Sequence, residues 1–111
     1  MSAREERIGL NEAVFREVNE RIEEVAETFE IQSQPLDLIC ECGDAKCVQP
    51  LSMTRTEYEH IRSDPHTFAV HPGHELPDVE EVVERRKGYY IVRKGEGIPE
   101  QIAERTDPRK H

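Results

Sequence analysis

The N-terminal part of the chain carries a helical pattern of apolar side chains. After a first step of seven residues, the apolar positions follow one another at alternating steps of three and four. The pattern predicts a helix over residues 2–30, although Gly9 leaves open a start near Asn11. The narrow apolar stripe consists of Ile8, Phe15, Val18, Ile22, Val25 and Phe29, with Asn11 in the remaining seam position. Charged side chains are expected to cover the rest of the helix, among them Glu12, Arg16, Glu20 and Glu23.

Two roles compete for this helix. The apolar stripe can lie on the protein's own core, or it can pair with a second copy or a partner protein as a coiled coil. Asn11 at a seam position would then set the register at some cost in stability. Because a helix of this length would overhang the small remainder of the chain, we expect self-association as a homodimer or binding of a protein partner.

Alternating and capped segments follow the helix. Residues 36–42 alternate in polarity, which predicts a strand, and residues 48–51 predict a second strand that Pro50 marks as an edge. Thr54 and Glu57 have the spacing of a capping box, so residues 55–62 are expected to form a short helix. Its core-facing side chains would be Tyr58 and Ile61, with His60 in solvent.

The C-terminal half predicts further short strands. Residues 68–70 form a brief apolar run, and residues 79–85 and 89–94 predict a hairpin with β-branched and aromatic content. The first strand of that hairpin could instead be helical, given its glutamates. Residues 99–105 could form one or two helical turns before a polar tail.

Composition limits the classes of partner. The formal net charge is −9, from 24 acidic and 15 basic side chains, and it disfavours binding to nucleic acid. Basic residues at 85–87 and 93–94 are expected to be solvated hairpin surface. No apolar run approaches the roughly 20 residues of a membrane span, and the acidic start does not resemble a targeting peptide. We therefore expect a soluble, cytoplasmic protein.

All three cysteines of the chain, Cys40, Cys42 and Cys47, fall within eight consecutive residues. In a strand, Cys40 and Cys42 would project from one face while Glu41 faces away. A turn at Gly43, where glycine accepts a positive φ, would then return Cys47 toward the other thiols. Three converging thiolates are typical of a metal site, and zinc is the metal that we expect.

A tetrahedral zinc site needs a fourth ligand, and histidine must supply it because no further cysteine exists. His71 and His74 flank a Pro-Gly turn. We favour His74 as the fourth ligand, with His71 as the alternative. Three unliganded thiols, a disulfide and an iron–sulfur cluster are the less favoured interpretations.

The cysteines allow three functions. The first is a structural zinc site in a protein–protein interaction or regulatory module. The second is a thiol-based redox or stress sensor that uses the zinc-bound cysteines. The third is a zinc-dependent hydrolase with an open metal position and Glu41 or Glu75 as general base. The sequence lacks the His-Glu-x-x-His motif of zinc proteases, so we expect a protein that is not an enzyme.

Several motifs occur in a recognisable order. They are Asn11-Glu12 and residues 15–22, Cys40-Glu41-Cys42-Gly43 with Cys47, Glu57-Tyr58-Glu59 with Arg62, and Pro72-Gly73-His74-Glu75. This order resembles a family of small bacterial proteins of uncharacterised function. The resemblance implies a stand-alone small protein and no particular reaction.

Together these features predict an α+β fold. A long N-terminal amphipathic helix over residues 1–31 precedes a small metal-binding domain over residues 36–95. That domain is expected to be a zinc knuckle of short antiparallel strands and one short helix. Residues 96–111 would form a C-terminal turn or short helix and a polar tail. With only 35% hydrophobic residues, the core is small and a metal ion would contribute much of the stability.

Overall fold

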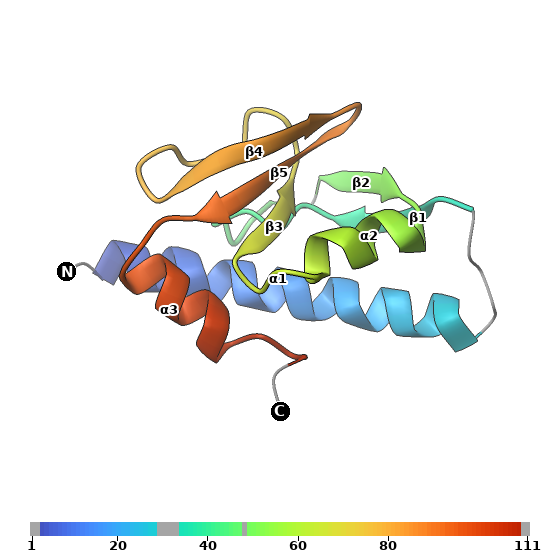
Figure 1. The fold of residues 1–111 in the computed structure, drawn as a ribbon, viewed down its shortest axis with the longest axis horizontal. Coiled ribbons are helices and arrows are strands. Elements are labelled where there is room, and N and C mark those ends of the chain that lie inside the picture. Colours follow the sequence, from blue (N-terminus) through green and yellow to red (C-terminus); the bar gives the residue numbers. More distant parts are fainter. Residues whose placement is uncertain (1–2, 29–33, 48, 110–111) are drawn as a thin grey trace.

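The computed structural model describes residues 3–28, 34–47 and 49–109. Its fold is α+β, as predicted, with one long helix along one side of the molecule (Figure 1). The elements in chain order are α1 (Ala3–Thr28), β1 (Leu36–Ile39), β2 (Pro50–Met53), α2 (Arg55–Arg62), β3 (Thr67–Val70), β4 (Glu80–Arg86), β5 (Tyr89–Lys94) and α3 (Ile98–Arg105).

The strands form two antiparallel sheets. β1 pairs with β2, and the second sheet has the order β3-β5-β4. The hairpin prediction is confirmed, because β4 pairs with β5, and the helical alternative for its first strand is wrong. The pairing has an irregularity between Val82 and Glu84. β1 ends at Ile39, so the predicted strand over residues 36–42 is too long. β2 begins at Pro50, and the predicted start at Val48 lies outside the described residues.

The short helix α2 has the predicted bounds and the predicted cap. The Thr54 side chain accepts a hydrogen bond from the Glu57 amide, while the Glu57 carboxylate accepts one from the Thr54 amide at 2.7 Å. Tyr58 and Ile61 are buried, as expected from their spacing. The capping box thus fixes where the helix starts, and its apolar face fixes how it packs.

The segment after β1 joins the two sheets. The Glu41 amide donates to the Ala69 carbonyl in β3 at 2.7 Å, and the Cys40 amide donates to the Gln49 carbonyl at 2.9 Å. The cysteine-bearing segment is therefore hydrogen-bonded on both sides, to β3 and to the chain that leads into β2. Backbone pairing holds it in place before any metal is considered.

Helix α1 packs with its polar face inward, contrary to the expectation that charged residues cover its solvent side. Its buried positions include Glu12, Arg16, Asn19, Glu20 and Glu23. Within the predicted apolar stripe, Ile8 is buried and Phe15 and Ile22 are half-buried, but Val18 and Val25 are exposed. Phe29 lies outside the described residues. The interpretation that this stripe lies on the protein's own core is wrong for its two valines.

The polar face of α1 is buried because its side chains bind polar groups of the neighbouring elements. Arg16 is fully buried and donates to the Pro65 carbonyl at 2.8 Å and to the Ala103 carbonyl at 2.7 Å. Its guanidinium also lies 4.4 Å from the centroid of the Phe68 ring. Carbonyl oxygens at the ends of neighbouring elements need donors, which a purely apolar helix face could not supply.

A second buried polar cluster lies beneath the same helix. The Lys94 ammonium contacts the Glu12 carboxylate at 2.8 Å and the Glu80 carboxylate at 2.7 Å, and all three side chains are almost fully buried. Lys94 is therefore core, and the expectation that residues 93–94 form solvated surface is wrong for it. Burial raises the pKa of Glu12 to about 8, against the opposing effect of Lys94. Glu12 thus favours its protonated form between Lys94 and Glu80.

None of the described helices is long and apolar enough to cross a membrane.

Candidate metal centre

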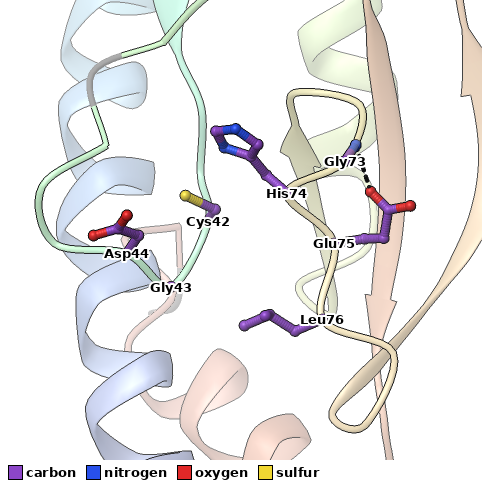
Figure 2. Close-up of a pocket in the computed structure, with 7 residues that line it drawn as sticks. All are labelled: Cys42, Gly43, Asp44, Gly73, His74, Glu75 and Leu76. Atoms are coloured by element: carbon purple, nitrogen blue, oxygen red, sulfur yellow. Dashed lines mark hydrogen bonds between the residues drawn. The ribbon is translucent and has the colours of Figure 1, made fainter.

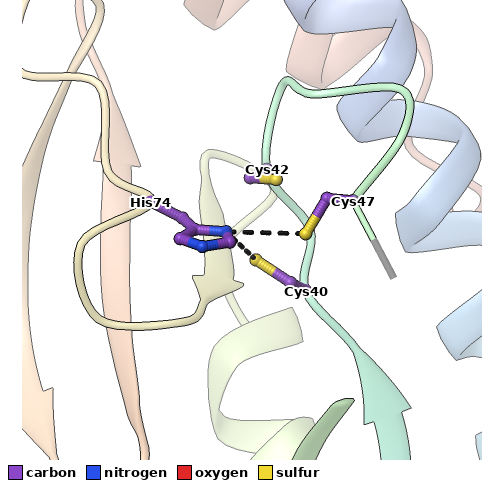
Figure 3. A group of neighbouring side chains, drawn as sticks. All are labelled: Cys40, Cys42, Cys47 and His74. Carbon is purple, nitrogen blue, oxygen red and sulfur yellow. Dashed lines mark hydrogen bonds between the residues drawn. The ribbon is translucent and has the colours of Figure 1, made fainter. Parts of the chain in front are cut away.

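The structure brings Cys40, Cys42, Cys47 and His74 together. Their sulfur and ring-nitrogen atoms lie within 4.8 Å of one another, and the side chains point toward a common centre (Figure 3). The His74 Nδ1 atom lies 3.6 Å from the Cys40 sulfur and 3.5 Å from the Cys47 sulfur. The three cysteines are buried and His74 is half-buried.

The two distances from His74 Nδ1 to the sulfurs of Cys40 and Cys47 match an edge of a zinc tetrahedron. A zinc–sulfur bond of about 2.3 Å and a zinc–nitrogen bond of about 2.0 Å, at a tetrahedral angle, separate the two ligand atoms by about 3.5 Å. The four side chains therefore lie within the distance at which they could hold a metal ion. The donor set of three sulfurs and one imidazole nitrogen is also one that zinc favours over oxygen-seeking ions.

A turn stabilised by Asp44 returns Cys47 to the other two cysteines. The Cys47 amide donates to the Asp44 carbonyl at 3.0 Å, and the Asp44 carboxylate accepts a hydrogen bond from the Lys46 amide at 2.9 Å. Gly43 does not have a positive φ, so the expected conformational role of this glycine is wrong. An aspartate that bonds to the amide two residues ahead supplies the turn instead.

Gly43 is instead a point of close approach to α1. A Cβ atom at this position would lie 2.6 Å from the Ile8 Cγ2 atom, which is closer than packed carbon atoms allow. The Gly43 carbonyl accepts a hydrogen bond from the Asn11 side chain at 2.9 Å. Asn11 therefore binds the cysteine segment of its own chain.

His74 reaches the cluster from the opposite side on a tight turn. The His74 amide donates to the His71 carbonyl at 2.9 Å, and Gly73 has a φ of 94°. Proline followed by a glycine with positive φ is typical of a type II turn. Residues 71–74 therefore place His74 by the turn chemistry that the sequence indicated.

The alternative ligand, His71, serves the cluster through its backbone. Its amide donates to the Cys40 sulfur at 3.1 Å, whereas its ring Nδ1 bonds to the Pro72 carbonyl at 3.0 Å. The ring is not part of the cluster, so the structure favours His74 over His71. His60 and His66 lie elsewhere, bonded to Glu84 and Glu104.

Each sulfur receives a backbone hydrogen bond. The amides of His71, Asp44 and Gln49 donate to Cys40, Cys42 and Cys47, and each of these bonds lowers the pKa of its thiol. The hydrogen bond between the Cys40 and Cys42 thiols lowers the pKa of Cys42 to about 5 and raises that of Cys40. The site thus favours a thiolate at Cys42 on its own, and its amides are placed to stabilise all three sulfurs as thiolates.

The sequence did not predict the role of Glu41. Its carboxylate is fully buried and accepts hydrogen bonds from the Asn19 amide at 2.9 Å, the Tyr58 hydroxyl at 2.8 Å and the Ala69 backbone amide at 3.0 Å. Burial raises the pKa of Glu41, and the three hydrogen bonds oppose that effect. Glu41 points away from the cysteines, as the alternation of the segment predicted, but it lies in the core, which the sequence did not predict. It therefore cannot act as a general base at the cluster.

Asn19 completes this support. Its side chain accepts a hydrogen bond from the Ile39 amide at 2.8 Å and donates one to the Ile39 carbonyl at 2.8 Å. An amide side chain thus pairs with the free edge of β1 as a neighbouring strand would. Two asparagines on one face of α1, Asn11 and Asn19, therefore bind the backbone on either side of the first two cysteines. The signal in the sequence was their eight-residue spacing, which keeps them on one helix face.

A hollow of about 210 Å³ opens beside the cluster (Figure 2). Cys42 and His74 line it together with Gly43, Asp44, Gly73, Glu75 and Leu76. Glu75 accepts a hydrogen bond from the Gly73 amide at 2.8 Å, and its carboxylate points away from Cys42 in Figure 2. The hollow gives small solutes a path to one side of the cluster, and Glu75 supports the turn.

Comparisons with protein-family models, with curated proteins and with solved structures find no match to this chain, so the function is argued from its own geometry.

Proposed function

We propose that this protein binds one zinc ion through Cys40, Cys42, Cys47 and His74, and that the ion stabilises the fold. The observation that carries the proposal is the separation of His74 Nδ1 from the sulfurs of Cys40 and Cys47, 3.6 and 3.5 Å. A zinc tetrahedron requires about this distance. Three thiolates need a cation at their centre to remain buried side by side, and zinc supplies it.

A structural role follows from the ligand count. Three sulfurs and one nitrogen fill a tetrahedral shell, so no position remains for the water that a catalytic zinc ion activates. The ligands come from two segments, around residues 40–47 and 71–74, so the ion would link the cysteine loop to the turn after β3. The ion is therefore structural in this proposal, and we propose that the protein is a small zinc-stabilised module that acts by binding other protein surfaces.

Elemental analysis of purified protein tests this proposal. We expect about one zinc per chain in the wild type and substantial loss in the Cys42→Ser and His74→Ala variants. His71→Ala is the matched control, because it removes a neighbouring imidazole from the same turn while leaving the His71 backbone amide in place. Equal zinc loss in His71→Ala and His74→Ala would contradict the ligand assignment. Wild-type protein that folds without zinc would contradict the proposal.

A thiol-based redox sensor is the second candidate. The hollow beside Cys42 and His74 favours it, because a small oxidant could reach the Cys42 sulfur from this side. Hydrogen peroxide would oxidise two thiolates to a disulfide, taking up two protons and leaving as two waters, and the zinc ion would be released. Stoichiometric zinc release by peroxide that a dithiol reductant reverses would support sensing. Retention of zinc under the same treatment would leave the structural role alone.

A further inference from the structure

The outward face of α1 is unusually apolar for a helix exposed to solvent. Leu10, Val14, Val18 and Val25 have exposed fractions of 52, 59, 40 and 57%. Among the described residues, only one other large hydrophobic side chain is this exposed, Val83 in β4. The four residues of α1 follow one another at steps of four, four and seven, which keeps them on one side of the helix. We call this set the outer stripe.

The polar face of α1 packs against the rest of the protein, so the apolar outer stripe is left on the solvent side. The sheets and α2 lie on one side of the helix (Figure 1), and that side takes up Glu12, Arg16 and Asn19. A hollow of about 420 Å³ at the middle of the outer stripe is lined by Val14, Glu17, Val18 and Arg21. Clustered exposed apolar side chains of this kind typically mark an interaction surface.

Charges along the same face are arranged asymmetrically. Arg7 is exposed toward the N-terminal end of the stripe, and Glu24 is exposed toward its C-terminal end. Glu17 and Arg21, both exposed, lie 3.6 Å apart near the middle. An antiparallel pair of these helices would therefore place opposite charges against each other at both ends, whereas a parallel pair would oppose like charges.

We propose that the outer stripe binds a second copy of this chain, with the two α1 helices antiparallel. A two-fold axis requires one patch to complement itself. The midpoint between Val14 and Val18 falls at Arg16, and the midpoint between Arg7 and Glu24 falls between Phe15 and Arg16. One axis therefore brings Val14 of each copy to Val18 of the other and, at the same time, Arg7 to Glu24.

The charge of the protein argues against two other occupants of the outer stripe. A net charge of −9 opposes binding to nucleic acid or to an anionic membrane, both of which require a cationic face. The outer stripe contains none of the four cluster residues, so this inference does not depend on the metal. Zinc content measured on the same samples separates a failure of one proposal from a failure of the other.

Sedimentation equilibrium of the zinc-loaded full chain tests the inference. We expect the wild type to form a dimer and Val14→Glu to raise the dimer dissociation constant at least about tenfold, because each interface loses two apolar contacts at its centre. Val83→Glu is the matched control, since it adds the same charge at an exposed valine outside α1 and should leave the dimer intact. A monomeric wild type, or equal effects of the two variants, would overturn the proposal.

Charge reversal tests the antiparallel arrangement. Arg7→Glu and Glu24→Arg should each weaken the dimer, because each opposes like charges at both ends of the interface, and the double variant should restore it. All these positions are exposed, so unchanged zinc content and circular dichroism will show that the fold persists. A double variant that dimerises no better than the two single variants would exclude this pairing.

Discussion

The sulfur cluster and the charged cluster beneath α1 both place polar side chains in the interior, but they differ in what completes them. Lys94 lies between Glu12 and Glu80 and supplies the positive charge from the chain itself. Cys40, Cys42, Cys47 and His74 include no fixed positive charge, so three thiolates at this site would need an ion from outside. The comparison suggests that the charged cluster forms whenever the chain folds, whereas the sulfur cluster depends on metal supply.

Of the changes that test this comparison, removal of zinc should have the largest effect on the free energy of unfolding. A chelator should lower the apparent free energy of unfolding by several kcal/mol, on the order of the 10 kcal/mol typical of structural zinc sites. Urea unfolding followed by circular dichroism, with and without chelator, measures it. Added zinc should restore the original midpoint. An identical midpoint with and without chelator would show that the sulfur cluster, like the charged one, is complete without an ion.

Removal of the central cation should have the next largest effect. Lys94→Met leaves Glu12 and Glu80 buried without a positive charge, so we expect a loss of about 3–5 kcal/mol in the free energy of unfolding. Adding Glu12→Gln and Glu80→Gln should recover much of that loss, because the buried charge is then gone. Lys87→Met, an exposed lysine in the same hairpin, is the control and should change stability little. Equal losses from the two lysine variants would contradict a buried role for Lys94.

Loss of the Glu41 hydrogen bonds that support the cysteine segment should lower the free energy of unfolding by less than loss of Lys94. Glu41→Gln puts an amide N–H group where the carboxylate accepted hydrogen bonds from Asn19, Tyr58 and Ala69. We expect a loss of about 1–3 kcal/mol on thermal or urea unfolding, with zinc content unchanged. The exposed Glu81 provides the matched control, since Glu81→Gln should be neutral. Loss of zinc from Glu41→Gln would show that the carboxylate does more than hold the backbone.

The smallest effect, taken over a single pH unit, is a dependence of stability on pH. The pKa of Glu12 is raised from 4.5 to about 8, so between these values the folded state binds more protons than the unfolded chain. The free energy of unfolding should therefore fall as pH rises through this window, by about 1 kcal/mol per pH unit or less. Glu12→Gln should remove this contribution, and the difference between the two proteins at saturating zinc isolates it. A difference that does not change between pH 5 and 8 would contradict a protonated Glu12.

Local signals in the sequence predicted most elements of the fold. The capping box at Thr54 and Glu57 gave the bounds of α2, and β-branched and aromatic content gave the hairpin of β4 and β5. The cysteines were recognisable because they lie within eight residues, and the Pro-Gly turn singled out two histidines, of which His74 lies in the cluster. In each case the residues that interact lie close together in the chain, so their spacing carries the information.

The interior beneath α1 could not be predicted in this way. Glu12 and Lys94 are 82 residues apart, and Arg16 bonds to a carbonyl 87 residues away. On a helix, isolated charged side chains resemble a solvated face unless the distant partners are known. The role of Asn19 could not be predicted for the same reason, because its amide pairs with the backbone of β1, a separate element. Choosing which face of α1 is buried required the tertiary structure.

Zinc K-edge X-ray absorption of the purified wild-type protein tests the central claim most directly. It reports the number, type and distance of the atoms bound to the metal without any substitution. We predict three sulfur atoms at about 2.3 Å and one nitrogen atom at about 2.0 Å. Fewer sulfur ligands, or an oxygen atom in the fourth position, would contradict a closed site formed by Cys40, Cys42, Cys47 and His74.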